Sequence, residues 1–271
     1  MRTNVLVLTI LATLLALVFL VPMVYTLVSS LKSKAAILEF PIRWIPREIE
    51  LSNFVIPFTK RNFDTYFLNS ILAATTVTLC SLFISSMGGY SLAKFQFRGR
   101  NTLFLSVLLT LMLPVEVTMV PLALVTHFLK MINTWWGLIV PVIISPLGIF
   151  WMRQFLVTLP SDYINAGRID GLGEFQIYLR IILPLSRPAL GALLIFSFMM
   201  NWNSLIWPLI VAMRESLWTI PVALMIFVSE DDTLWNELFA TSVLAVMPTL
   251  VIFLVLRGNL IKGMTVGGIK G

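Results

Sequence analysis

The sequence predicts an all-α membrane protein with six transmembrane helices, and two observations support this prediction. The first is composition, because 58% of the 271 residues are hydrophobic and only 12% are charged, whereas a soluble domain carries about 25% charged residues. The second is the grouping of apolar residues into runs close to the ~20 residues that a helix needs to cross a bilayer. These runs cover residues 5–28, 67–92, 102–128, 136–157, 188–211 and 238–256. They lack the short alternation of apolar and polar residues that spanning β-strands show.

The first apolar run, residues 5–28, is interpreted as a retained transmembrane helix. Arg2 precedes it, as a basic residue precedes the apolar core of a secretory signal peptide. The run is longer than the roughly 7–15 residues of such a core, so a signal peptide is the weaker interpretation. Residues 1–271 are therefore expected to form a single transmembrane domain.

The loops between the predicted helices differ in charge, and this difference predicts the side of the membrane on which each lies. Three segments are basic: the loop after the second run, the loop after the fourth run and the C-terminal tail. Their basic residues are Lys94, Arg98, Arg100, Arg153, Arg168, Arg180, Arg187, Arg257, Lys262 and Lys270. Because loops rich in Lys and Arg remain in the cytoplasm, both termini are predicted to be cytoplasmic. The loop 29–66 is also basic, but it is longer and mixed with acidic residues, so it has less weight.

The sequence contains no group of residues suited to catalysis. No G-x-x-x-x-G-K-[ST] motif is present, so this chain is not expected to bind nucleotide phosphates. Cys80 is the only cysteine and His127 the only histidine, which argues against an internal disulfide or a metal site. The net charge of +6 is attributed to membrane topology and not to a nucleic-acid partner. The protein is predicted not to be an enzyme, and any energy source must lie on a partner.

One segment, Ile164–Leu190, differs from its apolar surroundings because it carries several charged residues, glycines and prolines. Asp170 and Gly171 form a turn signal. The apolar residues that follow the turn recur at helical spacing: Phe175, Tyr178, Leu179 and Ile182. Pro184 and Pro188 are expected to end this second helix and to redirect the chain. The segment is predicted to be a helical hairpin, whose apolar face must lie on this chain's own helices or on a separate protein.

The hairpin sequence "NAGRIDGLGEFQIYLRIILPLSRPAL" resembles the cytoplasmic coupling loop of permeases from binding-protein-dependent ABC importers, with its pattern E-A-A-x-x-D-G-A. Four further segments resemble the sugar-importer branch of this family, in the same order: "NSILAATTVTLCSLFISSMGGYSLAKFQFRGR", "INTWWGLIVPVIISPLGIFWMRQF", "NWNSLIWPLI" and "IKGMTVGGIKG". The short chain and its Gly/Lys tail are similar to the MalG-like second permease subunit. Five matches in order make this resemblance specific.

The resemblance implies a type I ABC importer permease architecture with a cytoplasmic coupling-helix hairpin at about residues 160–187. In this family the hairpin docks into a cleft of an ATPase subunit, which binds ATP and Mg²⁺, so no cofactor is expected on this chain. The expected partners are a second homologous permease subunit, two ATPase subunits, an extracytoplasmic solute-binding protein and the lipid of a bacterial inner membrane. The expected docking residues are Asn165, Ala166, Gly167, Arg168, Asp170 and Gly171.

Two docking positions depart from the family pattern. Asn165 occupies the position of the family's Glu, which removes a charge that could contact an ATPase arginine. Gly167 occupies the position of its second Ala, and a glycine should destabilise the short helix by roughly 0.5–1 kcal/mol. Docking is therefore expected to depend more on shape and on Arg168.

Five residues are candidates for the solute path. Glu116 is an acidic residue within an apolar run, and such residues often face a cavity or a partner. Asn201, Trp202, Asn203 and Trp207 combine amides with aromatic rings, as sugar sites do. Each also has a structural interpretation, because tryptophans occur at membrane interfaces and buried amides join helices.

A second structural pattern lies in the run 67–92. Ser81, Ser85 and Gly89 recur at intervals of four residues, which predicts a face of small residues for close helix packing.

The sequence thus predicts a permease subunit that forms half of the path for a sugar, oligosaccharide or polyol. A permease for glycerol phosphate is the alternative within the family. It ranks lower because an anion would require Lys or Arg along the path. A channel or carrier without an ATPase is the alternative from another class.

Overall fold

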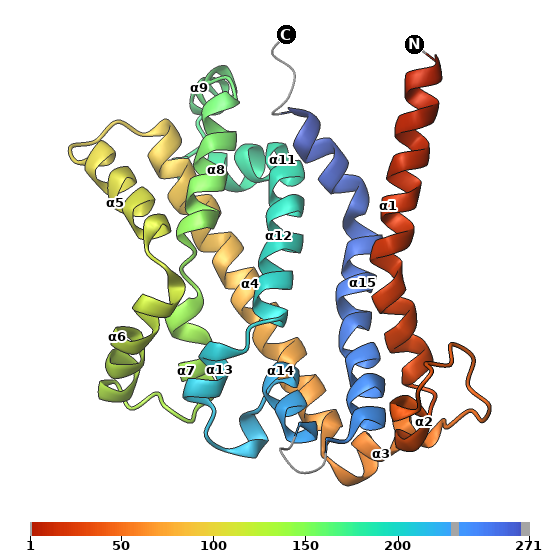
Figure 1. Cartoon of the computed structure of the whole chain (residues 1–271). Coiled ribbons are helices and arrows are strands. Elements are labelled where there is room, and N and C mark those ends of the chain that lie inside the picture. The colour runs from red at the N-terminus through yellow and green to blue at the C-terminus, as the bar shows by residue number, and fades with distance from the viewer. Residues whose placement is uncertain (1, 229–232, 267–271) are drawn as a thin grey trace. The chain divides into compact units, whose positions relative to one another are not determined.

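The structure, a computed structural model, describes residues 2–228 and 233–266. Every regular element in these ranges is a helix or a helical turn (Figure 1). The predicted all-helical fold is therefore confirmed. The chain divides into two compact units, and each unit is described by itself.

The first unit comprises Met1–Phe67 and Ile220–Met247. Its described elements are α1 (Arg2–Ser29), α2 (Lys34–Leu38), α3 (Ser52–Lys60), α14 (Ile220–Ala223), the 3₁₀ turn η4 (Leu224–Phe227) and the first part of α15 (Trp235–Val266). In the span Val5–Ser29, none of the most apolar window is buried in the chain. A helix that is apolar on all sides is stable only in an apolar environment, which fits contact with lipid.

Polar contacts of Asn53 join three parts of the first unit. Its Nδ2 donates hydrogen bonds to the carbonyl oxygens of Ser30 (3.0 Å) and Lys32 (2.8 Å). Its Oδ1 accepts one from Nδ2 of Asn236 at 2.8 Å. The buried amide is thus satisfied at both ends, as a buried polar group requires.

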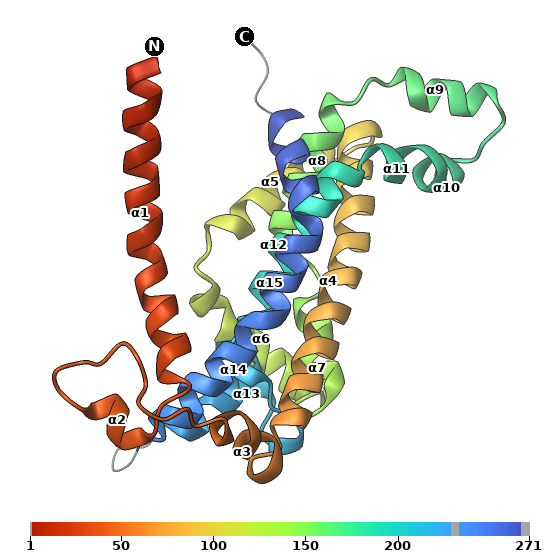
Figure 2. The same cartoon turned by 90° about the vertical axis from the view of Figure 1, so that its right-hand side faces the viewer.

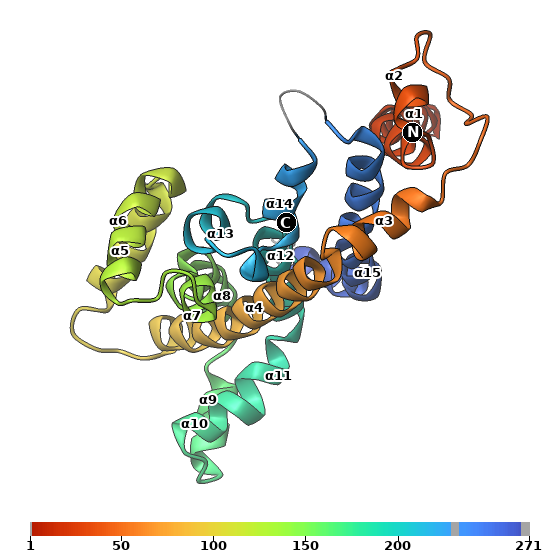
Figure 3. The same ribbon diagram turned by 90° about the horizontal axis from the view of Figure 1, so that it is seen from below.

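The second unit comprises Leu68–Thr219 and Pro248–Gly271. Its elements are α4 (Phe63–Lys94, which begins in the first unit), α5 (Arg100–Met112), α6 (Val115–Phe128), α7 (Trp135–Ile139), the 3₁₀ turn η1 (Val140–Val142), α8 (Pro146–Thr158), α9 (Asp162–Ile169), α10 (Glu174–Ile177), the π-helical turn η2 (Tyr178–Ile182), α11 (Leu183–Leu185), α12 (Arg187–Trp202), α13 (Ile206–Val211), the 3₁₀ turn η3 (Glu215–Leu217) and the last part of α15. In Figure 3, α5 and α6 lie on one side of α8, and α9–α11 lie on another.

Four of the described helical stretches are long and apolar enough to cross a membrane, and two bent pairs raise this number to six if each pair is one span. The four are Val5–Ser29, Phe63–Lys94, Trp135–Thr158 and Trp235–Val255. The bent pairs are Arg100–Met112 with Val115–Phe128 (107°) and Glu174–Leu185 with Arg187–Trp202 (78°).

The apolar run 102–128 is broken at Leu113 and Pro114 and is not one straight helix. A residue before proline is disfavoured in the α region. Leu113 is accordingly extended, with φ −80° and ψ 127°.

The run 188–211 is also broken, because α12 ends at Trp202 and α13 begins at Ile206. Nδ2 of Asn203 donates to the carbonyl of Met199 at 2.8 Å. Such local side-chain bonds compete with the continuing helix. The sequence predicts this apolar run as one helix because hydrophobicity alone does not report the break.

The small-residue face on α4 packs closely against α8, as predicted. Ser81 and Ser85 are buried. A Cβ atom added to Gly89 would lie 2.6 Å from Cβ of Met152, and one added to Gly148 would lie 2.3 Å from Oγ of Ser85. The two backbones approach too closely for larger residues at these points.

Candidate functional site

The candidate coupling hairpin has two helical arms that lie beside the ends of α4, α8 and α12 (Figure 2). The first arm is α9, and the second is the continuous stretch Glu174–Leu185 formed by α10, η2 and α11. Gly171 lies in the turn between the arms with φ +78°, a conformation that favours glycine. An added Cβ at Gly171 would meet no atom within 4 Å, so its backbone conformation, and not close packing, explains this glycine.

The second arm ends at Leu185, between Pro184 and Pro188, the two prolines predicted to end it. The turn before Pro184 is π-helical, and the amide of Leu183 donates to the carbonyl of Tyr178. A proline lacks the amide that an α-helix needs at its interior, and this wider turn accommodates the chain there. The bend of 78° falls at Ser186, and Pro188 lies in the first turn of α12.

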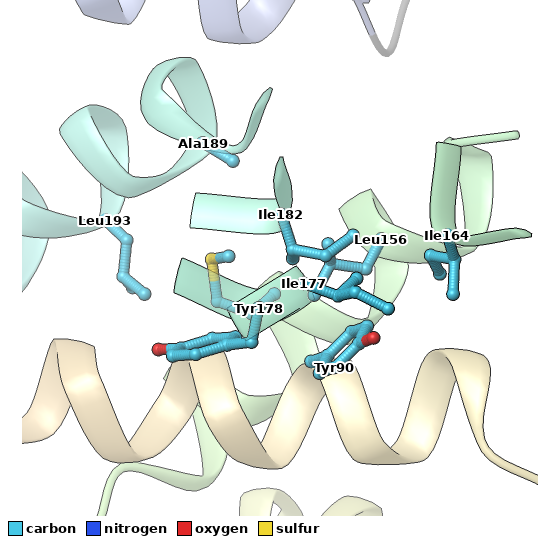
Figure 4. Close-up of a cluster of buried hydrophobic side chains, with 9 residues drawn as sticks. Tyr90, Leu156, Ile164, Ile177, Tyr178, Ile182, Ala189 and Leu193 are labelled. Atoms are coloured by element: carbon cyan, nitrogen blue, oxygen red, sulfur yellow. The ribbon is translucent and has the colours of Figure 1, made fainter. Parts of the chain in front are cut away.

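The inner face of the hairpin is buried on this chain's own helices. One apolar cluster joins five helical segments, and Figure 4 shows its labelled side chains converging. They are Tyr90 of α4, Leu156 of α8, Ile164 of α9, Ile177, Tyr178 and Ile182 of the second arm, and Ala189 and Leu193 of α12. Tyr178 and Ile182 of the predicted apolar stripe are thus covered by the chain's own helices, whereas Phe175 and Leu179 of that stripe are 56% and 42% exposed.

Polar contacts also fix the hairpin and its neighbours. The hydroxyls of Tyr178 and Ser86 are 2.6 Å apart in a buried hydrogen bond between the second arm and α4. Nζ of Lys94 donates to the carbonyl of Leu159 between α8 and α9. Nε of Arg100 donates to the carbonyl of Leu92 at 2.8 Å and so satisfies the end of α4.

Arg168 is paired within the hairpin. Its Nε lies 2.7 Å from Oε1 of Glu174, the first residue of the second arm. This hydrogen bond raises the pKa of Arg168 above its ordinary value. The guanidinium predicted to carry more of the docking thus already has a partner, and the sequence pattern did not indicate that partner.

Gly167 faces the second arm and is buried. An added Cβ would lie 2.8 Å from Cδ1 of Ile181 and 3.1 Å from Cγ1 of Ile177. The glycine therefore lets the side chains of Ile181 and Ile177 pack directly against the backbone of α9. Because it is covered, Gly167 does not lie on the outward surface with the other docking candidates.

The outward surface of the hairpin contains Asn165, Ala166, Asp170 and Gly171, all of which are exposed. Ile169 lies with them and is 86% exposed. The sequence reasoning missed this residue, although its spacing of three and four residues from Ala166 and Asn165 places it on the same helix face.

Three of the predicted solute-path residues, Asn201, Trp202 and Trp207, line one small pocket of about 30 Å³ in the second unit. Trp202 and Trp207 are buried, and Nε1 of Trp207 donates to the carbonyl of Gly137 at 3.2 Å. Nδ2 of Asn201 donates to the carbonyl of Ser197 at 2.9 Å and lies 3.4 Å from Oγ1 of Thr78. These contacts connect α12 and α13 with α4 and α7.

The remaining two path candidates, Glu116 and Asn203, are exposed. Glu116 lies in the first turn of α6, where the helix dipole favours an acidic residue. Asn203 follows α12 and uses Nδ2 in its bond to Met199. The structure does not bring the five candidates together in one cavity.

Comparison with known proteins identifies the family. Residues 84–266, which include the hairpin, match the model of the "Binding-protein-dependent transport system inner membrane component". The chain belongs to this family.

Two relatives that align with nearly all of this permease chain agree with the assignment of the chain to this family. The chain is 37% identical over 260 residues to the arabinooligosaccharides transport system permease protein AraQ of Bacillus subtilis (strain 168), covering 95% of this chain and 92% of that protein. It is 32% identical over 255 residues to the sn-glycerol-3-phosphate transport system permease protein UgpE of Salmonella typhi, covering 91% of each.

A solved structure supports the fold. The match is to a chain in the crystal structure of a bacterial ABC transporter involved in the import of the acidic polysaccharide alginate. The two chains share 22% sequence identity and superimpose with a TM-score of 0.85 over 96% of this chain and 97% of that one. The protein is thus a multi-pass inner-membrane permease of an ABC importer, a non-catalytic component that works with an ATPase and a binding protein.

The permease has a cavity of about 410 Å³ formed by residues of α6, of α12 and of the segment that follows α12. It is lined by Met119, Phe196, Met199, Met200, Asn203, Ser204, Leu205 and Ile206. Asn203 is the one predicted path residue in this lining, and Ser204 is its polar neighbour. The sequence reasoning missed the methionines, which resemble ordinary core residues because their spacing fits a helix.

Proposed function

We propose that this permease forms half of the translocation path for a sugar, oligosaccharide or polyol, together with a second homologous permease subunit. Two ATPase subunits, which bind ATP and Mg²⁺, would drive the cycle, and an extracytoplasmic binding protein would deliver the solute. The similarity to the arabinooligosaccharide permease supports this class of solute.

The proposed coupling depends on one observation, the two-sided character of the hairpin. Its inner face is fixed to α4, α8 and α12 by the apolar cluster, while Asn165, Ala166, Ile169 and Asp170 remain exposed on the outside. A segment that is rigid on one side and free on the other can transmit a movement. Closure of the ATPase pair would pull the hairpin and shift the helices between inward-open and outward-open states, each stabilised by its own partner contacts.

We propose that both termini and the hairpin face the cytoplasm. The hairpin, Lys94 and Arg100 lie in adjoining segments of the second unit, and this grouping of basic residues follows the positive-inside rule. The basic residues of the loop 29–66 have local roles in the first unit: Lys32 donates to the carbonyl of Arg43, and Arg61 pairs with Glu237 at 3.4 Å.

A glycerol-phosphate importer is the second candidate, supported by the similarity to UgpE. The lining of the cavity near Asn203 contains no Lys or Arg. A phosphate would be expected to need a cationic partner there. We therefore rank a neutral, hydroxyl-rich solute first.

Two experiments test the proposal. Reconstitution of the complete transporter in liposomes should give ATP-dependent uptake of an arabinooligosaccharide and not of glycerol 3-phosphate; the reverse preference would select the second candidate. In a Cys80→Ser background, Ala166→Cys should cross-link to the ATPase subunit in the assembled complex. If the hairpin never reaches the ATPase, the proposed coupling is wrong.

A further inference from the structure

We propose that Glu174 is a positioning residue that connects the coupling helix α9 to the membrane helix α4 and so sets the position of α9 relative to α4. This inference rests on the proposed function, because it assigns the route by which docking would reach the membrane. The residue lies outside the docking motif, and no role was predicted for it from the sequence.

The two carboxylate oxygens of Glu174 contact different segments. Oε1 accepts the hydrogen bond from Nε of Arg168 on α9 at 2.7 Å. Oε2 accepts from the hydroxyl of Tyr90 on α4 at 3.4 Å. One side chain at the start of the second arm therefore bridges the first arm and a transmembrane helix.

The two hydrogen bonds of Glu174 differ in length, and therefore in how they respond to movement of the hairpin. The bond to Arg168 is charge-assisted and short. The bond from Tyr90 is longer than the ~2.7–2.8 Å usual between oxygens. A small movement of the hairpin toward α4 would shorten it, and a movement away would break it. The Tyr90 bond is therefore the one that is sensitive to the position of the hairpin.

The Tyr90 hydroxyl is held in place by packing of its ring. The ring is 5% exposed and lies 5.9 Å from the ring of Tyr178 and 5.2 Å from that of Phe95, measured between centroids. The acceptor on the hairpin thus meets a donor whose position is set by α4 and its neighbours.

The side chains of the Arg168–Glu174 pair are partly exposed, so we infer that the pair positions the two arms more than it stabilises the fold. The side chains of Arg168 and Glu174 are 49% and 43% exposed, and ion pairs this exposed contribute little to stability. Asn165 has no carboxylate with which to hold a cation. Glu174 instead supplies a carboxylate between the two arms, where it connects the docking helix to α4.

The experiment uses the complete transporter in liposomes and measures ATP hydrolysed per solute imported. Glu174→Gln removes the charge, and Tyr90→Phe removes only the hydroxyl while its ring remains in the cluster. Each is expected to raise the ratio roughly twofold, because a hydrogen bond of this length contributes at the low end of the range for such bonds. Arg180→Gln, which changes an exposed charge on the same arm, is the control and should leave the ratio unchanged.

The double variant Tyr90→Phe with Glu174→Gln separates positioning from a general structural defect. If both residues act through one bond, the double variant should be no worse than the more affected single variant. Additive losses, or a normal ratio in both single variants, would overturn the proposal.

A cross-link from Ala166→Cys to the ATPase in the same variants distinguishes failure of the Glu174 proposal from failure of the proposed function. A cross-link with normal ratios would reject the role of Glu174 and leave the proposed function intact. Absence of the cross-link in the parent complex would reject the proposed function itself.

Discussion

The hairpin and the junction between α12 and α13 both place polar residues in an apolar chain, but they use them differently. At the junction, the indole of Trp207 and the amide of Asn201 are turned inward and bond to neighbouring helices. On the hairpin, Asn165 and Asp170 remain exposed, and the inner face is apolar. In this permease, polar side chains that bond to neighbouring helices join those helices. Polar side chains that remain exposed instead form a surface available to a partner.

The largest expected effect is on stability and occurs at the junction between α12 and α13. Trp207→Ala should destabilise the permease by about 3–5 kcal/mol, because a large buried side chain is removed. Trp207→Phe, which keeps an aromatic ring but loses the bond to Gly137, should cost only about 1 kcal/mol. Thermal unfolding in detergent measures both. Full stability of the alanine variant would show that the residue is not a joint.

The next effect concerns the close contact between α4 and α8 that supports both regions. Gly89→Ala should cost about 1–3 kcal/mol through overpacking, because its Cβ would lie 2.6 Å from that of Met152. Gly88→Ala is the matched control, since its Cβ would lie at an ordinary 3.5 Å from Ile149. The same unfolding measurement should separate the two adjacent glycines, and equal stabilities would contradict the close packing.

A smaller change in stability, with a larger change in function, is expected at the turn of the hairpin. Gly171→Val should cost about 1–2 kcal/mol through its positive φ. It should abolish transport and solute-stimulated ATP hydrolysis while membrane insertion continues. Gly173→Ala is the control, because Gly173 has φ −72° and no atom within 4 Å of an added Cβ. Unchanged uptake by the valine variant would argue against the hairpin as the coupling element.

The smallest effect is expected at Glu116, which is exposed and outside both regions. Glu116→Gln should change stability by no more than the ~0.3–1 kcal/mol of a helix-dipole interaction. Solute uptake should remain near the wild-type level, as measured in the liposome assay. A clear loss of uptake at unchanged stability would instead assign Glu116 to the solute path.

The hairpin shows how far sequence reasoning reached. Its two arms and the turn at Gly171 were predictable, because local periodicity and turn chemistry act over a few residues. The π-helical turn before Pro184 was not, since it is visible only in the backbone. The inward position of Gly167 was also missed. The low helix propensity of glycine is visible in the sequence, whereas its contact with Ile181 depends on how the two arms pack together.

The solute-path residues show what could not be predicted from the sequence. Asn201, Trp202 and Trp207 have the composition of a sugar site and line one small pocket, but Asn201 and Trp207 also bond to neighbouring helices. Asn203, two residues from Asn201, reaches a cavity. Composition cannot separate these cases, because neighbouring residues on a broken helix face different surroundings.

The sequence by itself determined the helical membrane class, the place of the charged hairpin and the turn that closes it, because these depend on composition and short-range spacing. Only the tertiary structure decided which surface covers the apolar face of the hairpin and which atoms satisfy each buried polar group. It also decided that Glu174 meets both Arg168 and Tyr90. The physical reason is that periodicity specifies a face of a helix, whereas its partner depends on how distant segments pack together.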